Sequence, residues 1–335
     1  AGIDLQMFDG YIGFSVDYYN TNTSNMLLYV PVPLLTGYST SLQNLGKVNN
    51  RGWELALTSQ HTFANGFGYS FNANYAKNTN EVKELGPGNA PIISSGSVAH
   101  AYYITEVGKP IGNYYLLVQD GIFATEEDLK KYPHFDNTEV GDFRFVDVDG
   151  DGKLDLDKDR TICGNYMPKF TYGFGGKLWY AGFDMDFNFQ GVYGNKILNL
   201  NKRYLDNMEG NTNGTKIALD RWKSPENPGS GSVNKANRKQ TGYNSRTSTW
   251  HLESGSYLRL QNLSLGYTLP RALTQKFKVE KMRVYVSGQN LFTITNYSGY
   301  NPEVNARPSK NLTPGEDYGT YPLARTYMFG LNITL

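Results

Sequence analysis

Hydrophobic and polar residues alternate with a period of two in many segments of this chain. Such alternation places successive side chains on opposite faces of a β-strand. The apolar positions of the predicted strands are Ile12, Phe14, Val16 and Tyr18; Trp53, Leu55 and Leu57; Tyr69, Phe71, Ala73 and Tyr75; Phe170, Tyr172, Phe174, Leu178 and Tyr180; Phe183, Met185, Phe187 and Phe189; Leu263, Leu265, Tyr267 and Leu269; Met282, Val284 and Val286; and Tyr327, Phe329, Leu331, Ile333 and Leu335. The pattern predicts an all-β protein with about eight strands, each roughly the 9–11 residues that cross a bilayer when tilted.

Connection lengths distinguish a membrane barrel from a soluble β-sandwich. Alternation does not, because the strands of a sandwich also alternate between hydrophobic and polar residues. Asn65-Gly66 and Ala181-Gly182 are tight-turn pairs, and 270–281 is a modest turn. The other connections, 20–47, 80–168, 195–255 and 297–325, are long and polar. Outer-membrane barrels have short periplasmic turns and long external loops, whereas a sandwich has no reason to keep its long loops at one end. The sequence therefore predicts a transmembrane antiparallel β-barrel, with 81–168 and 195–256 as long extracellular loops.

Composition agrees with a barrel and excludes other classes. The mean hydropathy is −0.51, which is expected when lipid-facing and lumen-facing residues alternate. No apolar run approaches the roughly 18 residues of a membrane-spanning helix. The net charge of +1 gives no reason to expect a nucleic-acid partner, and the single Cys163 excludes an intramolecular disulfide. The 26 Tyr and 17 Phe suit strands and the aromatic girdles of membrane barrels.

Five stretches resemble the SusC/RagA-like TonB-dependent nutrient importers of the outer membrane. They are NLGKVNNRGWEL (44–55), the stretches 141–178, 257–270 and 283–303, and the terminal TYMFGLNITL. The resemblance implies that 1–335 is the C-terminal section of a barrel of about 22 strands. The family's signal peptide, plug domain and TonB-contacting segment have no counterpart in this sequence. Gly330, Ile333 and Leu335 match the spacing of the terminal assembly strand, although the family more often ends in an aromatic residue.

The resemblance also implies a function and partners. The whole importer would take up an oligosaccharide across the outer membrane of a Gram-negative cell, driven by TonB acting on the plug, with a SusD-like lipoprotein as its lid. An oligopeptide is the alternative ligand within the same family. A different class stays open, because about eight strands also close a small barrel that would be a non-transporting anchor or adhesin.

No catalytic pattern stands out, so we do not expect an enzyme. The sequence has no Ser-His-Asp pattern, phosphate loop or nucleotide fingerprint. Asp184 and Asp186 lie on the polar side of a predicted strand and are expected to line a lumen. The four histidines are scattered without metal-ligand spacing: His61, His100, His134 and His251.

One acidic motif predicts a structural calcium site. Asp147, Asp149 and Asp151 occupy positions 1, 3 and 5 of an EF-hand-like loop, and Gly152 supplies the sharp turn. Lys153 would contribute its backbone carbonyl, and Asp155 is a further possible ligand. Lys158 stands where a closing acid belongs, so we expect Asp159 to close the site, with Asp157 as second choice. The alternative is a solvated acidic turn without an ion.

Two features of the long loops complete the predictions. Tyr204, Arg221, Trp222, Tyr243 and Trp250 are candidate ligand contacts, because aromatic faces suit sugar rings and Arg suits carboxylates. Packing within the loop is the alternative for each of them. Thr125-Glu126-Glu127-Asp128 predicts a capping box that opens a short helix.

Overall fold

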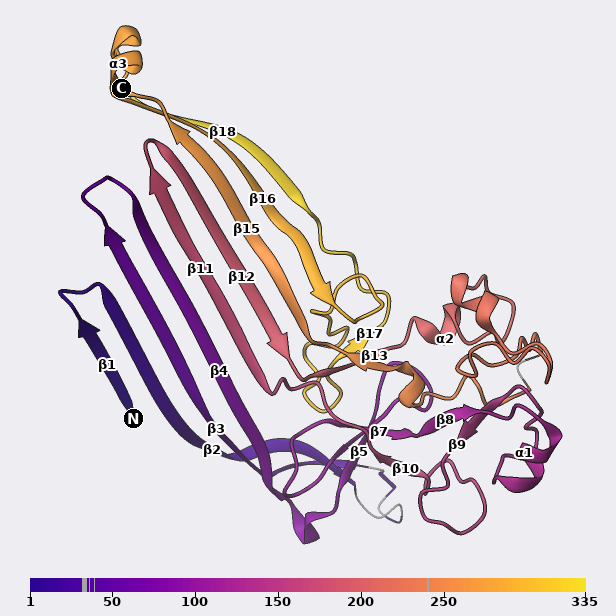
Figure 1. Cartoon of the computed structure of the whole chain (residues 1–335). Coiled ribbons are helices and arrows are strands. Elements are labelled where there is room, and N and C mark those ends of the chain that lie inside the picture. Colours follow the sequence, from indigo (N-terminus) through magenta and orange to yellow (C-terminus); the bar gives the residue numbers. More distant parts are fainter. Residues whose placement is uncertain (32–34, 36, 39, 240) are drawn as a thin grey trace.

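The computed structural model describes residues 1–335 apart from 32–34, 36, 39 and 240. A nine-stranded antiparallel sheet forms a tall, open wall with the strand order β1-β2-β3-β4-β11-β12-β15-β16-β18 (Figure 1). The wall strands are β1 (Gly2–Met7), β2 (Ile12–Pro31), β3 (Thr40–Thr62), β4 (Gly68–Leu85), β11 (Phe170–Tyr180), β12 (Phe183–Tyr193), β15 (Tyr257–Thr268), β16 (Lys281–Thr295) and β18 (Thr326–Thr334). The predicted all-β fold is thus confirmed. No helix among the described residues is long and apolar enough to cross a membrane.

The wall differs from the predicted one at its N-terminal side. β1 was not predicted, because six residues give too short an alternation to stand out. β2 continues to Pro31 and β3 begins at Thr40, so most of the predicted connection 20–47 is strand. Asparagine side chains support this polar extension: Asn49 Nδ2 donates to Asn20 Oδ1 and Asn22 Oδ1 at 2.6 and 3.0 Å. The tip of the hairpin lies largely outside the described residues.

Short turns lie at one end of the wall and long connections at the other, as Figure 1 shows. The turn between β11 and β12 consists of Ala181 and Gly182 with φ of 48° and 85°. Two consecutive left-handed residues form a turn whose twist matches that of the paired strands. The C-terminus and the short helix α3 (Arg271–Thr274) lie at this same end. The predicted distribution of short and long connections is therefore present in the structure.

The paired register gives the wall two chemically different faces. Cross-strand neighbours share a face, and the faces alternate along each strand. One row across five strands consists of Leu178, Met185, Leu265, Val286 and Phe329. The adjacent row on the opposite face consists of Lys177, Asp186, Ser264, Ser287 and Met328. We call the two surfaces the apolar face and the polar face of the wall.

The long connections carry secondary structure of their own. They contain β5 (Ile92–Ser95), β6 (Tyr102–Thr105), β7 (Asn113–Leu117), β8 (Gln119–Ile122), α1 (Glu126–Lys131), β9 (Phe143–Phe145), β10 (Arg160–Ile162), β13 (Lys196–Asn199), α2 (Lys202–Leu205), β14 (Leu252–Ser254) and β17 (Glu316–Asp317). Three small sheets result, with strand orders β10-β7-β6-β5, β14-β13-β17 and β8-β9. The predicted capping box opens α1, where Thr125 and Asp128 cap each other's backbone. The loops thus form a folded layer over one end of the wall (Figure 1).

Candidate functional site

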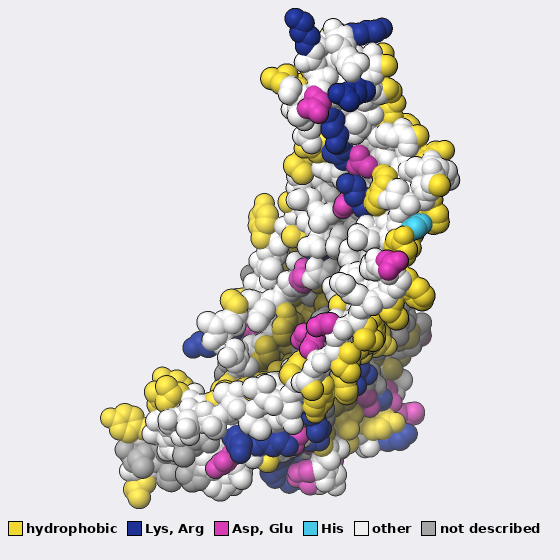
Figure 2. Space-filling view, turned by 90° about the vertical axis from the view of Figure 1, so that its left-hand side faces the viewer, with side chains coloured by type: hydrophobic (Ala, Val, Ile, Leu, Met, Phe, Trp, Pro, Cys, Tyr) yellow, Lys and Arg dark blue, Asp and Glu magenta, His cyan; other side chains and the backbone are white. Residues whose placement is uncertain are grey.

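The apolar face of the wall has the surface of a lipid-facing barrel. Many of its large side chains are exposed although they are hydrophobic, among them Phe183, Leu265, Val284 and Phe329. Hydrophobic side chains follow the margin of the wall in Figure 2, beside a column of charged ones. Exposed apolar area of this extent is unfavourable in water and favourable in a bilayer.

Aromatic residues gather towards both ends of the apolar face. At the end with the short turns, Phe183 packs on Tyr267 with ring centroids 4.5 Å apart. Towards the end with the long loops, Phe170 stacks on Tyr193 at 4.9 Å. Two such rows are the girdles that membrane barrels place at the two headgroup layers. The span between them therefore marks the part of the wall that lies in the membrane.

The polar face carries the groups that a water-filled lumen requires. Arg283 forms a bidentate pair with Asp184, with Nε–Oδ1 at 2.8 Å and Nη2–Oδ2 at 2.5 Å. The guanidinium lies over Gly266, where a Cβ atom would clash with it. Asp184 was predicted to line a lumen, and it lies on this face together with Asp186. An ion pair of this kind fixes three neighbouring strands without exposing charge to lipid.

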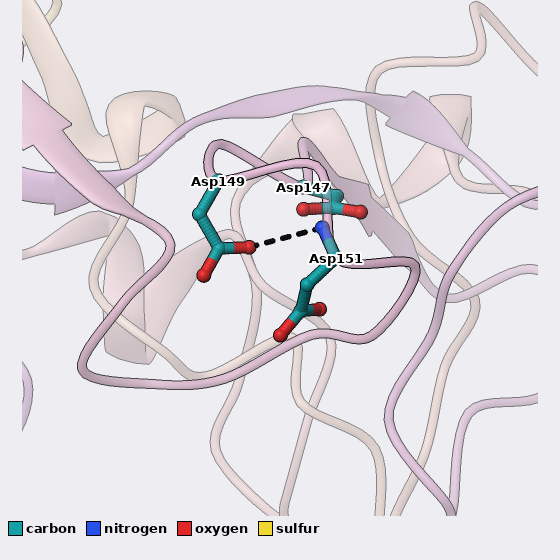
Figure 3. Close-up of side chains that lie close together, drawn as sticks. All are labelled: Asp147, Asp149 and Asp151. Carbon is teal, nitrogen blue, oxygen red and sulfur yellow. Dashed lines mark hydrogen bonds between the residues drawn. The ribbon is translucent and has the colours of Figure 1, made fainter.

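The acidic motif forms a compact group in the connection between β9 and β10. Carboxylate oxygens of Asp147, Asp149 and Asp151 all lie within 4.8 Å of one another. Figure 3 shows the three side chains around one space, with the backbone N–H of Asp151 donating to Asp149 Oδ1 at 3.2 Å. Within the described part of the chain this is the one group of three or more possible metal ligands, and it contains no histidine.

Backbone hydrogen bonds organise this loop around Asp147. Its Oδ1 accepts from the N–H of Gly150 at 2.7 Å, and its Oδ2 accepts from the N–H of Gly152 at 2.8 Å. These bonds, that from Gly152 above all, hold the pKa of the Asp147 carboxyl below its usual range. Both glycines have positive φ, 74° and 82°, which the tight loop requires. Asp147 is consequently ionised at neutral pH, which is the form that binds a cation.

The predicted closing residues have other partners in the structure. Asp159 is fully buried, and its two oxygens accept from the N–H of Val148 at 2.8 Å and of Asp155 at 2.6 Å. Asp155 accepts from the N–H of Asp157 and Lys158, and these bonds lower the pKa of its carboxyl. Asp159 therefore links Val148, at the start of the loop, to Asp155, near its end. It does not belong to the group formed by Asp147, Asp149 and Asp151.

Two neighbouring side chains bear on the charge of the site. Asp157 pairs with Arg160 at 3.0 Å, and the Lys158 Nζ lies 3.8 Å from Asp151 Oδ2. The backbone N–H of Lys153 donates to Asp151 Oδ1 at 2.9 Å. A lysine near Asp151 offsets part of the repulsion among the three carboxylates.

The geometry of the three aspartates fits calcium. Calcium takes oxygen ligands at about 2.3–2.6 Å, so two oxygens on one ion lie at most about 4.6–5.2 Å apart. The three aspartates meet this limit in the structure. Further ligands would come from backbone carbonyls and water, as is common for calcium in flexible loops.

Three predicted ligand contacts pack inside the loop layer. Trp222, Tyr243 and Trp250 lie against a hydrophobic core formed by Leu117, Ile122, Phe135, Phe143 and Phe145. Tyr243 stacks on Phe135 with ring centroids 4.0 Å apart. Trp222 Nε1 donates to Ala124 O, and Trp250 Nε1 donates to Ser232 O. These aromatics join the 195–256 loop to the 81–168 loop, which is the alternative that the sequence left open for them.

The other two predicted contacts are placed differently. Tyr204 is 42% exposed, and its hydroxyl lies 3.4 Å from the hydroxyl of Tyr318, which is 47% exposed. Tyr318 was not predicted, because it comes from a different connection and only the fold brings the two rings together. Arg221 Nη1 donates to Ala218 O at 3.0 Å. Of the predicted aromatic ligand contacts, Tyr204 is the one that is exposed, and it forms a pair with Tyr318.

A wall with one lipid-facing and one polar face, and with long loops at one end, defines an outer-membrane β-barrel protein. The chain belongs to the TonB-dependent receptor family: residues 1–291 match the family model described as TonB dependent receptor-like, beta-barrel. This confirms the predicted family and the outer-membrane location. The family consists of receptors and transporters, not of enzymes.

Named relatives support the same assignment. TonB-dependent receptor P3 of Formosa agariphila is 34% identical over 99% of this chain and 33% of its own length. TonB-dependent receptor SusC of Bacteroides thetaiotaomicron is 26% identical over 99% of this chain and 31% of its own. The structure of the RagAB peptide transporter superposes with a TM-score of 0.79 at 25% identity, over 99% of this chain and 34% of that chain. The chain thus spans about a third of the length of the curated relatives it matches.

Proposed function

We propose that this chain forms the C-terminal section of the barrel wall, with external loops, of an outer-membrane TonB-dependent importer. The observation that carries the proposal is the open nine-stranded wall with its separate apolar and polar faces. Its edge strands β1 and β18 do not pair with each other. A small closed anchor or adhesin barrel would need that pairing, so the wall favours a section of a larger barrel.

The remaining parts of the importer follow from this proposal. The rest of the barrel and a plug would complete the pore, and TonB would act on the plug. A SusD-like surface lipoprotein would cover the loop layer, as the resemblance to SusC/RagA-like importers implies. The loop layer suits a protein partner, since its small sheets and cores give it a fixed surface.

For the ligand, we propose an oligopeptide as the first candidate. The RagAB peptide transporter is among the structures that superpose on this chain. In addition, Trp222, Tyr243 and Trp250 pack against the loop core, so three of the aromatic rings predicted to contact sugar rings contact the protein itself. Oligosaccharide uptake, predicted from the sequence, is the second candidate, and the exposed pair of Tyr204 and Tyr318 favours it.

The role of the 195–256 loop in holding the lipoprotein can be tested by deletion. Its ends are close together, since the Gly255 N–H donates to Asn195 O at 3.0 Å, so a short Gly-Ser linker can replace it. We expect co-purification of the lipoprotein to fall at least about tenfold, because its docking surface and the core under it are lost. A change in gel mobility between unheated and heated samples of the barrel controls for insertion and folding. Unchanged recovery of the lipoprotein would show that the lid binds elsewhere.

Calcium binding by the Asp147 loop is a separate proposal with its own test. We expect Ca²⁺ to slow proteolysis of 81–168 in the intact protein, and chelation to accelerate it, because the ion removes repulsion among three carboxylates. Asp149→Asn should abolish this difference, whereas Asp136→Asn, in the same connection but outside the group, should preserve it. Protease sensitivity that ignores both Ca²⁺ and chelator would exclude the site. Affinity should fall at acidic pH as the carboxylates become protonated.

A further inference from the structure

A groove of about 450 Å³ opens between three external connections that are far apart in the sequence. One side is formed by the end of β2, at Met26, Leu27 and Tyr29. The second side is β5, and the third is the segment 307–313, which precedes β17. None of these residues stands out in the sequence, because the groove exists only where the three connections meet.

The groove lies on the inner side of the wall. Asn74 of β4 lies on the polar face, opposite Gly173. Val82 follows it eight residues later without a register shift, so both side chains point to the same side of the wall. Val82 packs in a small core with four residues that also line the groove: Met26, Ile92, Ile111 and Leu312. A ligand in the groove would therefore sit at the mouth of the lumen, above the membrane.

The groove follows the free edge of a strand. Among the described strands, β5 pairs with β6 alone, at the edge of its four-stranded sheet. All four of its residues line the groove, although successive side chains point to opposite faces. A groove that reaches all four residues must run along the unpaired edge. The Ser95 carbonyl accepts from Arg307, and the other backbone N–H and C=O groups that point away from β6 can pair with another extended chain.

The chemistry of the lining favours a peptide over a sugar. The floor is apolar, formed by the side chains of Met26, Ile92, Ile111 and Leu312 that pack with Val82, and Tyr29 is the one aromatic residue among the described lining residues. The described lining residues include Arg307 and Lys310 but no acidic side chain. Arg307 Nη1 donates to Ser95 O at 3.0 Å, which places its guanidinium at the end of β5. The edge of β5 can pair with the backbone of a short peptide, and the apolar floor can contact its side chains. The positive end can bind its carboxylate.

We propose that the groove beside β5 is a subsite for the imported oligopeptide, which adds to β5 as an extended strand and places a carboxylate at Arg307 and Lys310. The four residues of β5 span about 13 Å at 3.3 Å per residue, enough for a peptide of about four residues. This subsite rests on the proposed import of oligopeptides. It adds where the ligand binds and which part of it is recognised.

Peptide retention by the intact importer tests the subsite. The full-length protein with its lipoprotein, in mild detergent, is loaded with a tryptic digest of casein, washed and measured by mass spectrometry. A second portion of the digest is methyl-esterified to remove its carboxylates. The variant is R307Q/K310Q, and the control is Lys276→Gln, an exposed lysine at the short-turn end of the wall, outside both the groove and the external loops. We expect both the esterified digest and the double variant to reduce retention at least about tenfold, and the control to retain as much as wild type.

Each outcome separates the subsite from the function on which it rests. If wild type retains peptides but neither esterification nor R307Q/K310Q reduces retention, the subsite is wrong and peptide import stands. If wild type retains no peptide but binds oligosaccharides from a hydrolysed polysaccharide, both the subsite and the peptide function fall. The esterified digest needs no mutation, so its unchanged retention would exclude the subsite even if the double variant folds poorly.

Discussion

Leu263→Lys is expected to destabilise the folded barrel by about 2–4 kcal/mol, the cost of a lysine facing lipid near the bilayer centre. Leu263 lies on the apolar face and pairs with Phe187 of β12. Phe187 lies near the middle of β12, between Phe183 and Tyr193 at the two aromatic rows. A lysine at this depth cannot bring its ammonium group to either headgroup layer without strain.

The matched control is Ser264→Lys, one residue further along the same strand. Ser264 pairs with Asp186 and Ser287 on the polar face. A lysine there would meet water and a carboxylate, so we expect a change within about 0.5 kcal/mol. The comparison keeps strand, depth and introduced residue nearly constant and changes only the face.

Urea midpoints of the folded, SDS-resistant gel band measure both variants in the same detergent. A loss of stability for Leu263→Lys alone would support the assignment of faces. Equal behaviour of the two lysines would contradict it, because the pattern of alternation would then not correspond to lipid and lumen.

The wall could be predicted from the sequence because its rules are local. Alternation with period two assigns each residue to a face, and the left-handed pair Ala181-Gly182 assigns a hairpin. The extension of β2 and β3 escaped prediction, since its asparagines and threonines resemble a loop in composition. Their strand conformation depends on cross-strand partners such as Asn20 and Asn49, which sequence alone does not align.

The loop layer could be predicted only in its local motifs. The capping box at Thr125 and the aspartate group at Asp147 depend on neighbours within a few residues, and both are present. Trp222 and Tyr243 depend on partners about a hundred residues away, including Phe135. Side chains that suit a ligand also suit a core, so composition cannot tell the two roles apart. The groove beside β5 and the contacts of Glu316 are likewise products of long-range folding.

Glu316→Ala is expected to loosen the loop layer by about 2–4 kcal/mol, since it leaves buried donors without an acceptor. Glu316 is fully buried on β17. Its carboxylate accepts from the Ser97 N–H at 3.1 Å, from the Ser97 hydroxyl, and from the Tyr103 hydroxyl at 3.1 Å. Its backbone pairs with Leu198 of β13. The side chain of Glu316 therefore joins the connections that follow β4 and β16, and its backbone adds the connection that follows β12.

Hydrogen exchange of the intact protein gives the readout. Amides of β5 and β6 should exchange roughly 30- to 1,000-fold faster in Glu316→Ala, corresponding to the expected loss of stability, while those of β11 and β12 in the wall stay unchanged. Glu316→Gln keeps one acceptor and the volume of the side chain, so its effect should be intermediate. Glu226→Ala, at an exposed glutamate of the 195–256 loop, should leave exchange as in wild type. If Glu316→Ala accelerates exchange no more than Glu226→Ala, the loop layer is held by its hydrophobic cores and not by this carboxylate. Peptide binding in the groove beside β5 should also weaken in Glu316→Ala. Glu316 holds Tyr103 of β6, and β6 is the strand that pairs with β5.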